Sequence, residues 1–348
     1  MTGLPAPADA PTDEARAVGL QYVTDQSPGI RRIGSPPLFR YLDADNKEII
    51  DRAILTRIAK LALPPAWNDV WIAATATVHL QATGRDARGR KQYRYHPKWR
   101  ALREETKFAR MQAFGTALPE IRKHVERHLG LPGLPREKIL ATVVRLLEIT
   151  LIRVGNEEYV KANHSYGLTT LRNRHVNVSG GKLSFEFRGK SGKQHKIGLH
   201  DRRLATIVKR CKELPGAELF QYVDDQGRRH GIGSQDVNQY LQEITGNDFS
   251  AKDFRTWAGS VCALDALIEY PPCATESESK RIIAAVIKSV AQRLGNTPAV
   301  CRKHYIHPLV LESFTQQRLH ALCGRLPSVR DSARAEHAMM KLLRSVSQ

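Results

Sequence analysis

The sequence predicts an α+β protein with a small strand-rich N-terminal domain and a larger, mainly helical domain that contains a three-stranded antiparallel meander. Short alternating runs with glycine turns dominate the first hundred residues, helical periodicity dominates the rest, and one group of alternating runs interrupts the helices. At 348 residues the chain is too long for one small core. We expect a disordered tail at 1–28, a β-rich domain at 29–103 and a helical domain at 104–348.

The charge of the chain points to a polyanionic partner. The formal net charge is +19, and nucleic acid is favoured over a membrane because no long apolar span or lipidation signal is present. The five cysteines form no C-x-x-C pair, so neither a disulfide framework nor a zinc knuckle is indicated. The first 26 residues lack the features of a signal peptide, and we expect a cytoplasmic, nucleoid-associated protein.

The N-terminal domain is predicted to contain short strands and one helix. Residues 38–42 read as a strand before a turn-rich Asp-Ala-Asp-Asn segment, and residues 52–63 have helical spacing up to Pro64. A hairpin follows, with strands at 78–83 and 90–96 joined by a glycine-bearing turn. Its basic residues alternate with tyrosines, which suits a ribbon that contacts phosphates and enters a groove; a solvated edge strand protected by Lys and Arg is the alternative.

The chain then becomes helical. Residues 101–114 and 118–129 are rich in Arg, Lys and Glu, and residues 136–153 carry an apolar stripe behind a Gly-Leu-Pro turn signal. Arg153 ends this third helix. Taken alone, an arginine in a last turn is best explained as a partner for the helix carbonyls.

A meander is expected at residues 168–199, with strands at 168–178, 183–188 and 194–199. Lys190 lies in the second turn between glycines, where its long side chain can swing. Gly189-Lys190-Ser191 resembles the end of a P-loop, but strands flank it and the first glycine of that motif is missing. Nucleotide hydrolysis is therefore not supported.

Two helix boundaries in the C-terminal part carry polar candidates. Ser250 to Asp253 is a capping box that opens a helix to about residue 268, and Arg255 in its first turn lies where an anion is attracted. A later amphipathic helix runs into Gly295, which places Asn296 at a turn. A Thr-Pro pair then starts a short helix with Tyr305 near its far end, before Pro308. Residues 308–322 and 332–346 are expected to be two further helices.

The order and spacing of these candidates resemble the type IB DNA topoisomerases, specifically their compact viral and bacterial branch, which share a catalytic fold with the tyrosine recombinases. Gly89-Arg90-Lys91-Gln92-Tyr93 resembles the DNA-contacting hairpin of the small N-terminal domain. Residues 151–159, Leu-Ile-Arg-Val-Gly-Asn-Glu-Glu-Tyr, resemble the first arginine segment. The likeness spans residues 30 to 325 and implies a clamp around duplex DNA. The implied DNA contacts are Arg90, Lys91, Gln92, Tyr93, Tyr95, Tyr159 and Lys252.

The resemblance implies relaxation of positive and negative supercoils through a 3′-phosphotyrosyl intermediate, strand rotation and religation. Arg153 and Arg255 would neutralise the non-bridging oxygens, Lys190 would protonate the leaving 5′ oxygen, Asn296 would donate a hydrogen bond and Tyr305 would be the nucleophile. We expect a monomer that needs no nucleotide, metal or other cofactor. Eukaryotic and viral relatives usually carry His where this chain has Asn296, a neutral donor that does not titrate near pH 7.

Two alternatives remain. A tyrosine recombinase shares the Arg, Lys and Tyr plan, but its second arginine usually follows a His where this chain has Lys252, and its N-terminal domain is usually helical. A non-enzymatic basic DNA-binding protein would retain every activity after Tyr305→Phe.

Overall fold

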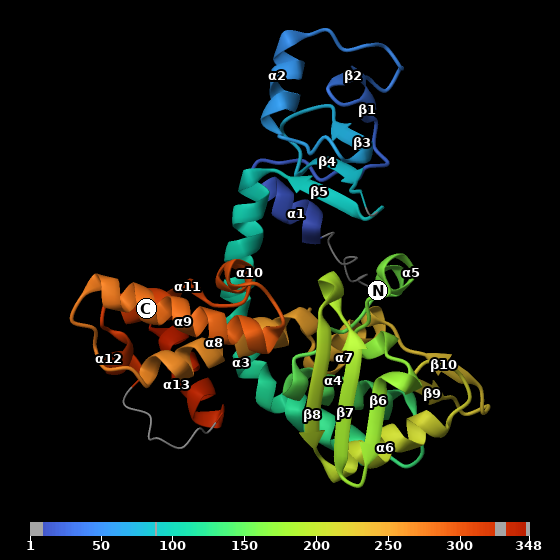
Figure 1. Ribbon diagram of the computed structural model, residues 1–348, viewed down its shortest axis with the longest axis vertical. Coiled ribbons are helices and arrows are strands. Elements are labelled where there is room, and N and C mark those ends of the chain that lie inside the picture. The colour runs from blue at the N-terminus through green and yellow to red at the C-terminus, as the bar shows by residue number, and fades with distance from the viewer. Residues whose placement is uncertain (1–9, 88, 324–331, 346–348) are drawn as a thin grey trace, which may run out of the picture. The chain divides into compact units, whose positions relative to one another are not determined.

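The computed structural model describes residues 10–87, 89–323 and 332–345. The chain divides into two compact units, Met1–Lys107 and Phe108–Gln348, and Figure 1 shows the elements of each. Each unit has its own hydrophobic core. About half of the residues, 52%, are helical and the sheets are antiparallel, which confirms the mixed helix and sheet class.

The N-terminal unit is built on a five-stranded sheet, as a strand-rich N-terminal part requires. The strand order is β2-β1-β3-β4-β5, and helix α2 (Arg52–Lys60) buries Ile58 in the core of this unit. The predicted hairpin is present: Thr83 pairs with Tyr93 across it. The strands are β1 (Gly29–Ser35), β2 (Leu38–Leu42), β3 (Asn68–Ala73), β4 (Leu80–Arg85) and β5 (Lys91–Tyr95).

The expected disordered tail at 1–28 is wrong for its described part, residues 10–28. Helix α1 (Ala10–Ala17) forms there, and Ala15 and Leu20 are buried against Trp99. The Gln21 amide also donates to the Thr77 carbonyl at 2.9 Å. Composition alone does not reveal this segment, because the apolar surface that orders it lies some eighty residues further along the chain. Residues 1–9 lie outside the described residues.

The two helices that follow the N-terminal sheet, α3 (Pro97–Leu129) and α4 (Arg136–Thr150), differ from the sequence prediction in two ways. Helix α3 is one helix with Pro119 inside it, where two helices were expected. Helix α4 ends earlier than expected, because Leu151 adopts the left-handed conformation with φ 57°. Arg153 therefore lies beyond the helix and not in its last turn.

The predicted meander is a three-stranded antiparallel sheet of β6 (Val176–Ser179), β7 (Lys182–Arg188) and β8 (Gln194–His200). Its first strand is shorter than predicted because residues 168–175 form two short 3₁₀ turns that fold back on the segment after α4: the Leu168 amide donates to the Arg153 carbonyl at 2.8 Å. A second small sheet, β9 (Gln221–Val223) with β10 (Arg229–Gly231), was not predicted.

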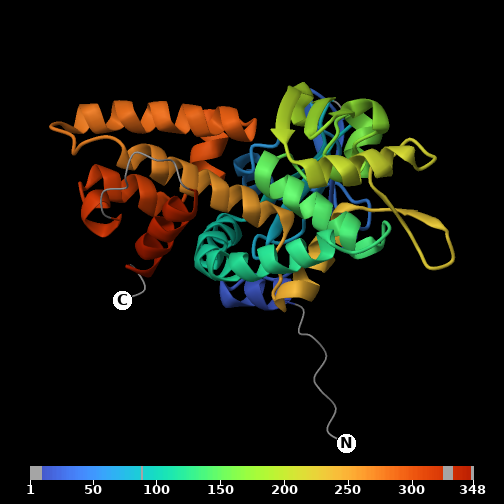
Figure 2. The ribbon, with the colours of Figure 1, turned by 90° about the horizontal axis from the view of Figure 1, so that it is seen from below.

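Helix α8 (Ala251–Ile268) is the central helix of this unit and contacts α4, α9 (Glu276–Leu294) and α13 (Ser332–Arg344). Figure 2 shows α8 and the long helix α9 side by side. The expected helix at 308–322 is divided in two, α11 and α12, and the last helix ends at Arg344. The remaining helices are α5 (Glu157–Asn163), α6 (Arg202–Glu213), α7 (Ser234–Thr245), α10 (Pro298–His304), α11 (Pro308–Thr315) and α12 (Leu319–Cys323).

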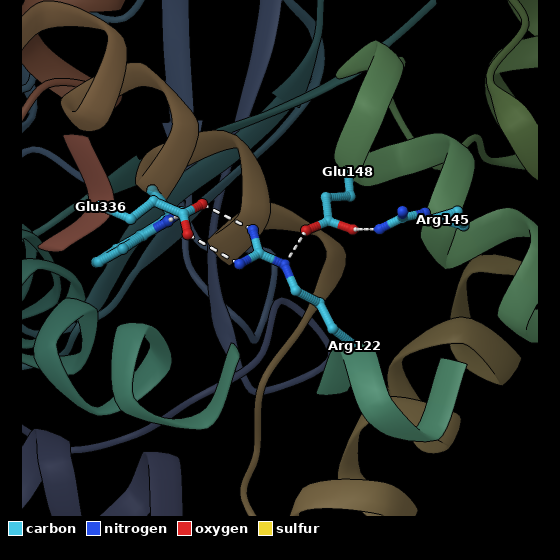
Figure 3. A network of polar contacts seen from close by, with 5 residues as sticks. Arg122, Arg145, Glu148 and Glu336 are labelled. Atoms are coloured by element: carbon cyan, nitrogen blue, oxygen red, sulfur yellow. Dashed lines mark hydrogen bonds and ion pairs between the residues drawn. The ribbon is translucent and has the colours of Figure 1, made fainter. Parts of the chain in front are cut away.

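A network of charged side chains joins α13 to helices α3 and α4 (Figure 3). Arg122 of α3 donates to both carboxylate oxygens of Glu336, at 2.8 and 2.7 Å, and to Glu148 of α4 at 2.6 Å. Arg145 completes the network with a 2.9 Å bond to Glu148. A bidentate pair of this kind fixes orientation as well as supplying energy, so the network sets the position of α13 against α3 and α4.

Candidate active site

Arg255 lies at the centre of the site and holds three helices together. It is the fifth residue of α8 and only 4% exposed. Its guanidinium donates to the carbonyl of Leu151 after α4 and to that of Leu294 at the end of α9, the latter at 2.7 Å. Carbonyls at helix ends lack intrahelical partners and carry the negative end of the helix dipole. Arg255 therefore fills the role at the end of α4 that the sequence pattern had suggested for Arg153, and that interpretation of Arg153 is corrected.

The Arg153 side chain does not bind the carbonyls at the ends of α4 and α9, and it contacts Asn296 instead. Its Nη2 donates to the Asn296 side-chain oxygen. Asn296 follows Gly295, which closes α9 with φ 61° as predicted, and the Asn296 amide donates to the Ala291 carbonyl at 2.9 Å. The Asn296 Nδ2 is buried and has no hydrogen-bond partner among the described residues. The Asn296 amide is therefore held in place with its Nδ2 donor unused by the described residues.

Tyr305 completes the group. It follows α10, which begins with the predicted Thr297 cap and Pro298, and its half-buried ring lies with its centroid 5.2 Å from the Arg255 guanidinium carbon. Burial lowers the pKa values of both Arg153 and Arg255, and a hydrogen bond with Tyr305 partly offsets this by raising them. The structure thus brings four of the five predicted catalytic residues together, Arg153, Arg255, Asn296 and Tyr305.

The electrostatics of this group favour an anion. Burial and, to a smaller extent, the neighbouring Arg153 cation together lower the pKa of Arg255 to about 10, and burial also lowers the pKa of Arg153. Neither arginine forms a salt bridge with a carboxylate in the described ranges. Two desolvated cations at one place, with an idle amide donor beside them, make a site that a phosphate would stabilise.

Helix α8 also holds the backbone around Tyr305. Gly259 leaves no room for a Cβ, because such an atom would collide with the Tyr305 carbonyl oxygen. The hydroxyl of Ser260, fully buried, shares its proton between the Thr256 carbonyl at 3.0 Å and the Tyr305 carbonyl at 3.3 Å. Its oxygen accepts from the His307 amide at 2.9 Å. Sequence analysis missed both residues, since a Gly-Ser pair inside a helix gives no signal of a contact made 45 residues later.

Lys190 is the predicted catalytic residue that the structure does not join to the others. It is exposed at the tip between β7 and β8, in a short 3₁₀ turn flanked by glycines, and no described hydrogen bond links its ammonium to the group. Lys193, three residues further on, does reach the site and donates to the Asn296 carbonyl at 3.1 Å. Sequence analysis singled out the first lysine of this tip and missed the second.

His195 is a further residue that sequence analysis missed. Its ring stacks on Phe187 across the sheet, with centroids 5.1 Å apart. Burial lowers its pKa, and the cations of Arg153, Arg255 and Lys193 lower it further. The alternation of His195 with Ile197 and Leu199 on one face of β8 could have indicated this inward position.

The predicted DNA-contacting residues are distributed over both units. In the N-terminal hairpin Arg90 pairs with Asp86 at 2.6 Å, Gln92 donates to the same carboxylate at 2.9 Å and Lys91 pairs with Asp25 at 2.5 Å. Two acids, Asp86 and Asp25, therefore already pair with the basic residues of this hairpin. Tyr93, half exposed, stacks on Tyr95 with centroids 5.9 Å apart, and in the C-terminal unit Tyr159 and Lys252 are exposed.

No described helix is long and apolar enough to cross a membrane. Across residues 10–87, 89–323 and 332–345 no cluster of three or more His, Cys, Asp or Glu side chains is arranged to hold a metal ion.

Comparison with known proteins decides the family. The chain is 34% identical over 293 residues to a DNA topoisomerase 1B of Acanthamoeba polyphaga mimivirus, covering 82% of this chain and 87% of the relative. A family model described as the catalytic core of eukaryotic DNA topoisomerase I matches residues 96–323. The chain belongs to the type IB DNA topoisomerases. This topoisomerase also matches the N-terminal domain of bacterial DNA topoisomerase IB, over residues 38–86.

More distant viral relatives extend the same result. The topoisomerase is 25% identical over 248 residues to DNA topoisomerase I of Monkeypox virus, and 24% identical over the same length to DNA topoisomerase 1B of Vaccinia virus strain Copenhagen. Each match covers 68% of this chain and 73% of the relative. Viral relatives together with a bacterial-type N-terminal domain confirm the resemblance to the compact branch of the family.

Proposed function

We propose that this topoisomerase relaxes positively and negatively supercoiled DNA by cutting one strand through Tyr305, allowing rotation, and rejoining the strand, with no nucleotide or metal. The observation that carries the proposal is the convergence of Arg153, Arg255 and Asn296 on Tyr305. Of the two arginines, Arg255 is buried and Arg153 half-buried, and neither pairs with a carboxylate of the described residues.

In the proposed step the Tyr305 phenol gives its proton to solvent water, its oxygen bonds to the phosphorus of a DNA linkage, and the bond from phosphorus to the 5′ oxygen breaks. Negative charge grows on the non-bridging oxygens, and the two forked guanidinium groups meet it. The unpartnered Asn296 Nδ2 supplies a third donor. Because the new 3′-phosphotyrosyl ester retains the energy of the broken bond, the free 5′ hydroxyl can reverse the step after rotation.

Lys190 is the proposed acid that gives a proton to the leaving 5′ oxygen. A primary alkoxide is a poor leaving group, so a positioned ammonium accelerates its departure. Lys190 is exposed at a tip between glycines, and this supports a role in which the side chain reaches the 5′ oxygen once DNA is bound.

Duplex DNA is the proposed partner of both units, which we propose to form a clamp around it, with the protein acting as a monomer. In the N-terminal unit Tyr93 and Gln92 would enter a groove, while Arg90 and Lys91 exchange part of their pairing with Asp86 and Asp25 for phosphates. Tyr159 and Lys252 would contribute contacts from the C-terminal unit, where both side chains are exposed.

Plasmid relaxation in EDTA, without ATP, tests the proposal. The wild-type protein is expected to relax plasmids of either sign, while Tyr305→Phe retains salt-sensitive duplex binding and loses relaxation completely. Tyr270→Phe, which removes an exposed phenol in the turn after α8, is the matched control and should relax plasmid normally. Relaxation by Tyr305→Phe would refute the choice of nucleophile, and a need for a paired DNA site would favour a recombinase.

A further inference from the structure

The imidazole of His195 fills the space between two predicted catalytic segments. It lies on β8 and stacks almost parallel on Phe187 of β7, with an interplanar angle of 11°. A Cβ placed on Gly189 would lie 2.5 Å from His195 Cδ2, and a Cβ placed on Gly295 would lie 2.8 Å from His195 Cε1. Real Cβ atoms do not come so close, so the ring contacts both chain segments only because each has a glycine there.

These two glycines immediately precede predicted catalytic residues. Gly189 is followed by Lys190 at the tip of the β7–β8 hairpin, and Gly295 is followed by Asn296 after α9. A second contact spans the same gap, because the Lys193 ammonium donates to the Asn296 carbonyl at 3.1 Å. The hairpin is therefore attached to the Asn296 turn at two points, one apolar and one polar.

The charges around His195 indicate that its contribution is geometric. Arg153, Arg255 and Lys193 face the ring, and these cations together with burial hold its pKa below the ordinary value of a histidine. The ring is thus neutral at neutral pH, where a protonated imidazole would add a fourth positive charge to those of Arg153, Arg255 and Lys193. The contribution of His195 is therefore the shape of its flat ring, which packs on Phe187 and fills the space beside Gly189 and Gly295.

We propose that His195 is a positioning residue that docks the Lys190 hairpin against the Asn296 turn and so sets where the Lys190 ammonium meets the leaving 5′ oxygen. This inference rests on the proposed function, because it assumes that Lys190 is the acid. A misplacement of about 1 Å can slow a reaction by about a hundredfold, so loss of the ring should act on the step that needs the proton.

The test compares single-turnover cleavage of two duplexes, one with an ordinary 5′ oxygen at the scissile bond and one with a 5′ sulfur, which leaves without a proton. His195→Ala is expected to slow cleavage of the oxygen substrate by about tenfold to a hundredfold and of the sulfur substrate by less than about threefold. Lys190→Ala should show the same selectivity more strongly. His195→Phe, which keeps a flat ring, should remain within about threefold of wild type on both duplexes.

His200→Ala is the matched control, because His200 lies at the opposite end of the same strand against Gly181. It should leave both rates unchanged. Should His195→Ala prove too unstable, Lys193→Met removes the other attachment and is expected to give the same selective loss of oxygen cleavage. Duplex binding measured without cleavage should be unchanged in the His195 variants.

Three results would overturn the inference. Equal slowing of both substrates by His195→Ala, with Lys190→Ala still selective, would reject docking by His195 and leave the proposed function intact. Equal slowing by Lys190→Ala itself would reject the acid assignment and the docking role together. A loss in His195→Phe as large as in His195→Ala would show that the imidazole nitrogens matter, against a role for ring shape.

Discussion

At the scale of single residues, the two arginines of the site differ in what the fold asks of them. Arg255 donates hydrogen bonds to the carbonyls after α4 and at the end of α9, whereas the Arg153 side chain donates to that of Asn296 and to no helix-end carbonyl. A lysine cannot reproduce a fork that reaches two acceptors at once. The same Arg→Lys substitution should therefore have different consequences at the two positions.

We predict that Arg153→Lys slows DNA cleavage by about a hundredfold to a thousandfold while changing the free energy of unfolding by less than about 1 kcal/mol. Arg255→Lys should slow cleavage and also lower the free energy of unfolding by about 2–4 kcal/mol, because two buried carbonyls lose a charged donor. Single-turnover cleavage and urea denaturation measure the two effects. Equal loss of stability in both variants would contradict the separate roles.

His307 provides a pH-dependent prediction. Its ring packs on Phe108 with centroids 4.9 Å apart, its Nδ1 accepts from the Leu309 amide at the start of α11, and burial lowers its pKa to about 4. An unfolded histidine titrates near 6.5, so between pH 6.5 and pH 4 the unfolded chain binds a proton that the folded chain does not. The free energy of unfolding should therefore fall as pH falls through this range, by about 1–3 kcal/mol from this residue.

His307→Asn isolates that contribution, because asparagine keeps a side-chain acceptor for the helix start and does not titrate. Urea denaturation at pH 7 and at pH 4.5 should show a smaller pH difference in the variant than in the wild type. An identical difference in the two proteins would show that His307 is protonated without cost in the folded state.

At the scale of helices and strands, an ion-pair network fixes the last helix. Glu336 of α13 accepts two bonds from Arg122 and a weaker one, 3.4 Å, from the indole of Trp257. We predict that Glu336→Gln lowers the free energy of unfolding by about 1–3 kcal/mol, because the half-buried Arg122 loses its bidentate partner. Glu276→Gln, which breaks an exposed pair with Lys280, should change it by less than about 0.5 kcal/mol. Equal effects in urea denaturation would show that the network is as weak as a surface pair.

Local signals predicted the helix boundaries that matter for the site. Gly295 closes α9, Thr297 and Pro298 open α10, and the capping box of α8 forms with the Ser250 amide 2.8 Å from the Asp253 carboxylate. Each depends on side chains within four residues, so the sequence is sufficient. The first strand of the meander was predicted too long because its beginning is held by the Arg153 segment, a contact that local pattern does not contain.

Two further misses have the same cause. The sequence placed Arg153 in the last turn of α4, but Leu151 turns the chain out of the helix and the distant Arg255 takes up its carbonyl. The tail was expected to be disordered because its composition is rich in Ala, Pro and Asp, but Ala15 and Leu20 are buried in a hydrophobic cluster with Trp99. In both cases a tertiary contact overrides a correct local argument.

At the scale of the whole molecule, the site draws its four converging residues from four separate segments, the chain after α4, the start of α8, the turn after α9 and the end of α10. Spacing alone does not bring such segments together; the resemblance to a family supplied their order, and the structure supplies the contacts. The net charge of +19 and the hairpin of the N-terminal unit fit a DNA partner, although Asp25 and Asp86 already neutralise part of that hairpin.

The most direct test of the central claim is identification of the peptide that becomes attached to DNA. A duplex that traps the covalent intermediate would be cleaved by the wild-type protein, the adduct digested with trypsin, and the linked peptide sequenced by mass spectrometry. The account predicts a peptide that carries Tyr305 joined to the 3′ phosphate, with a free 5′ hydroxyl on the other fragment. Attachment through another tyrosine, or to a 5′ phosphate, would contradict it.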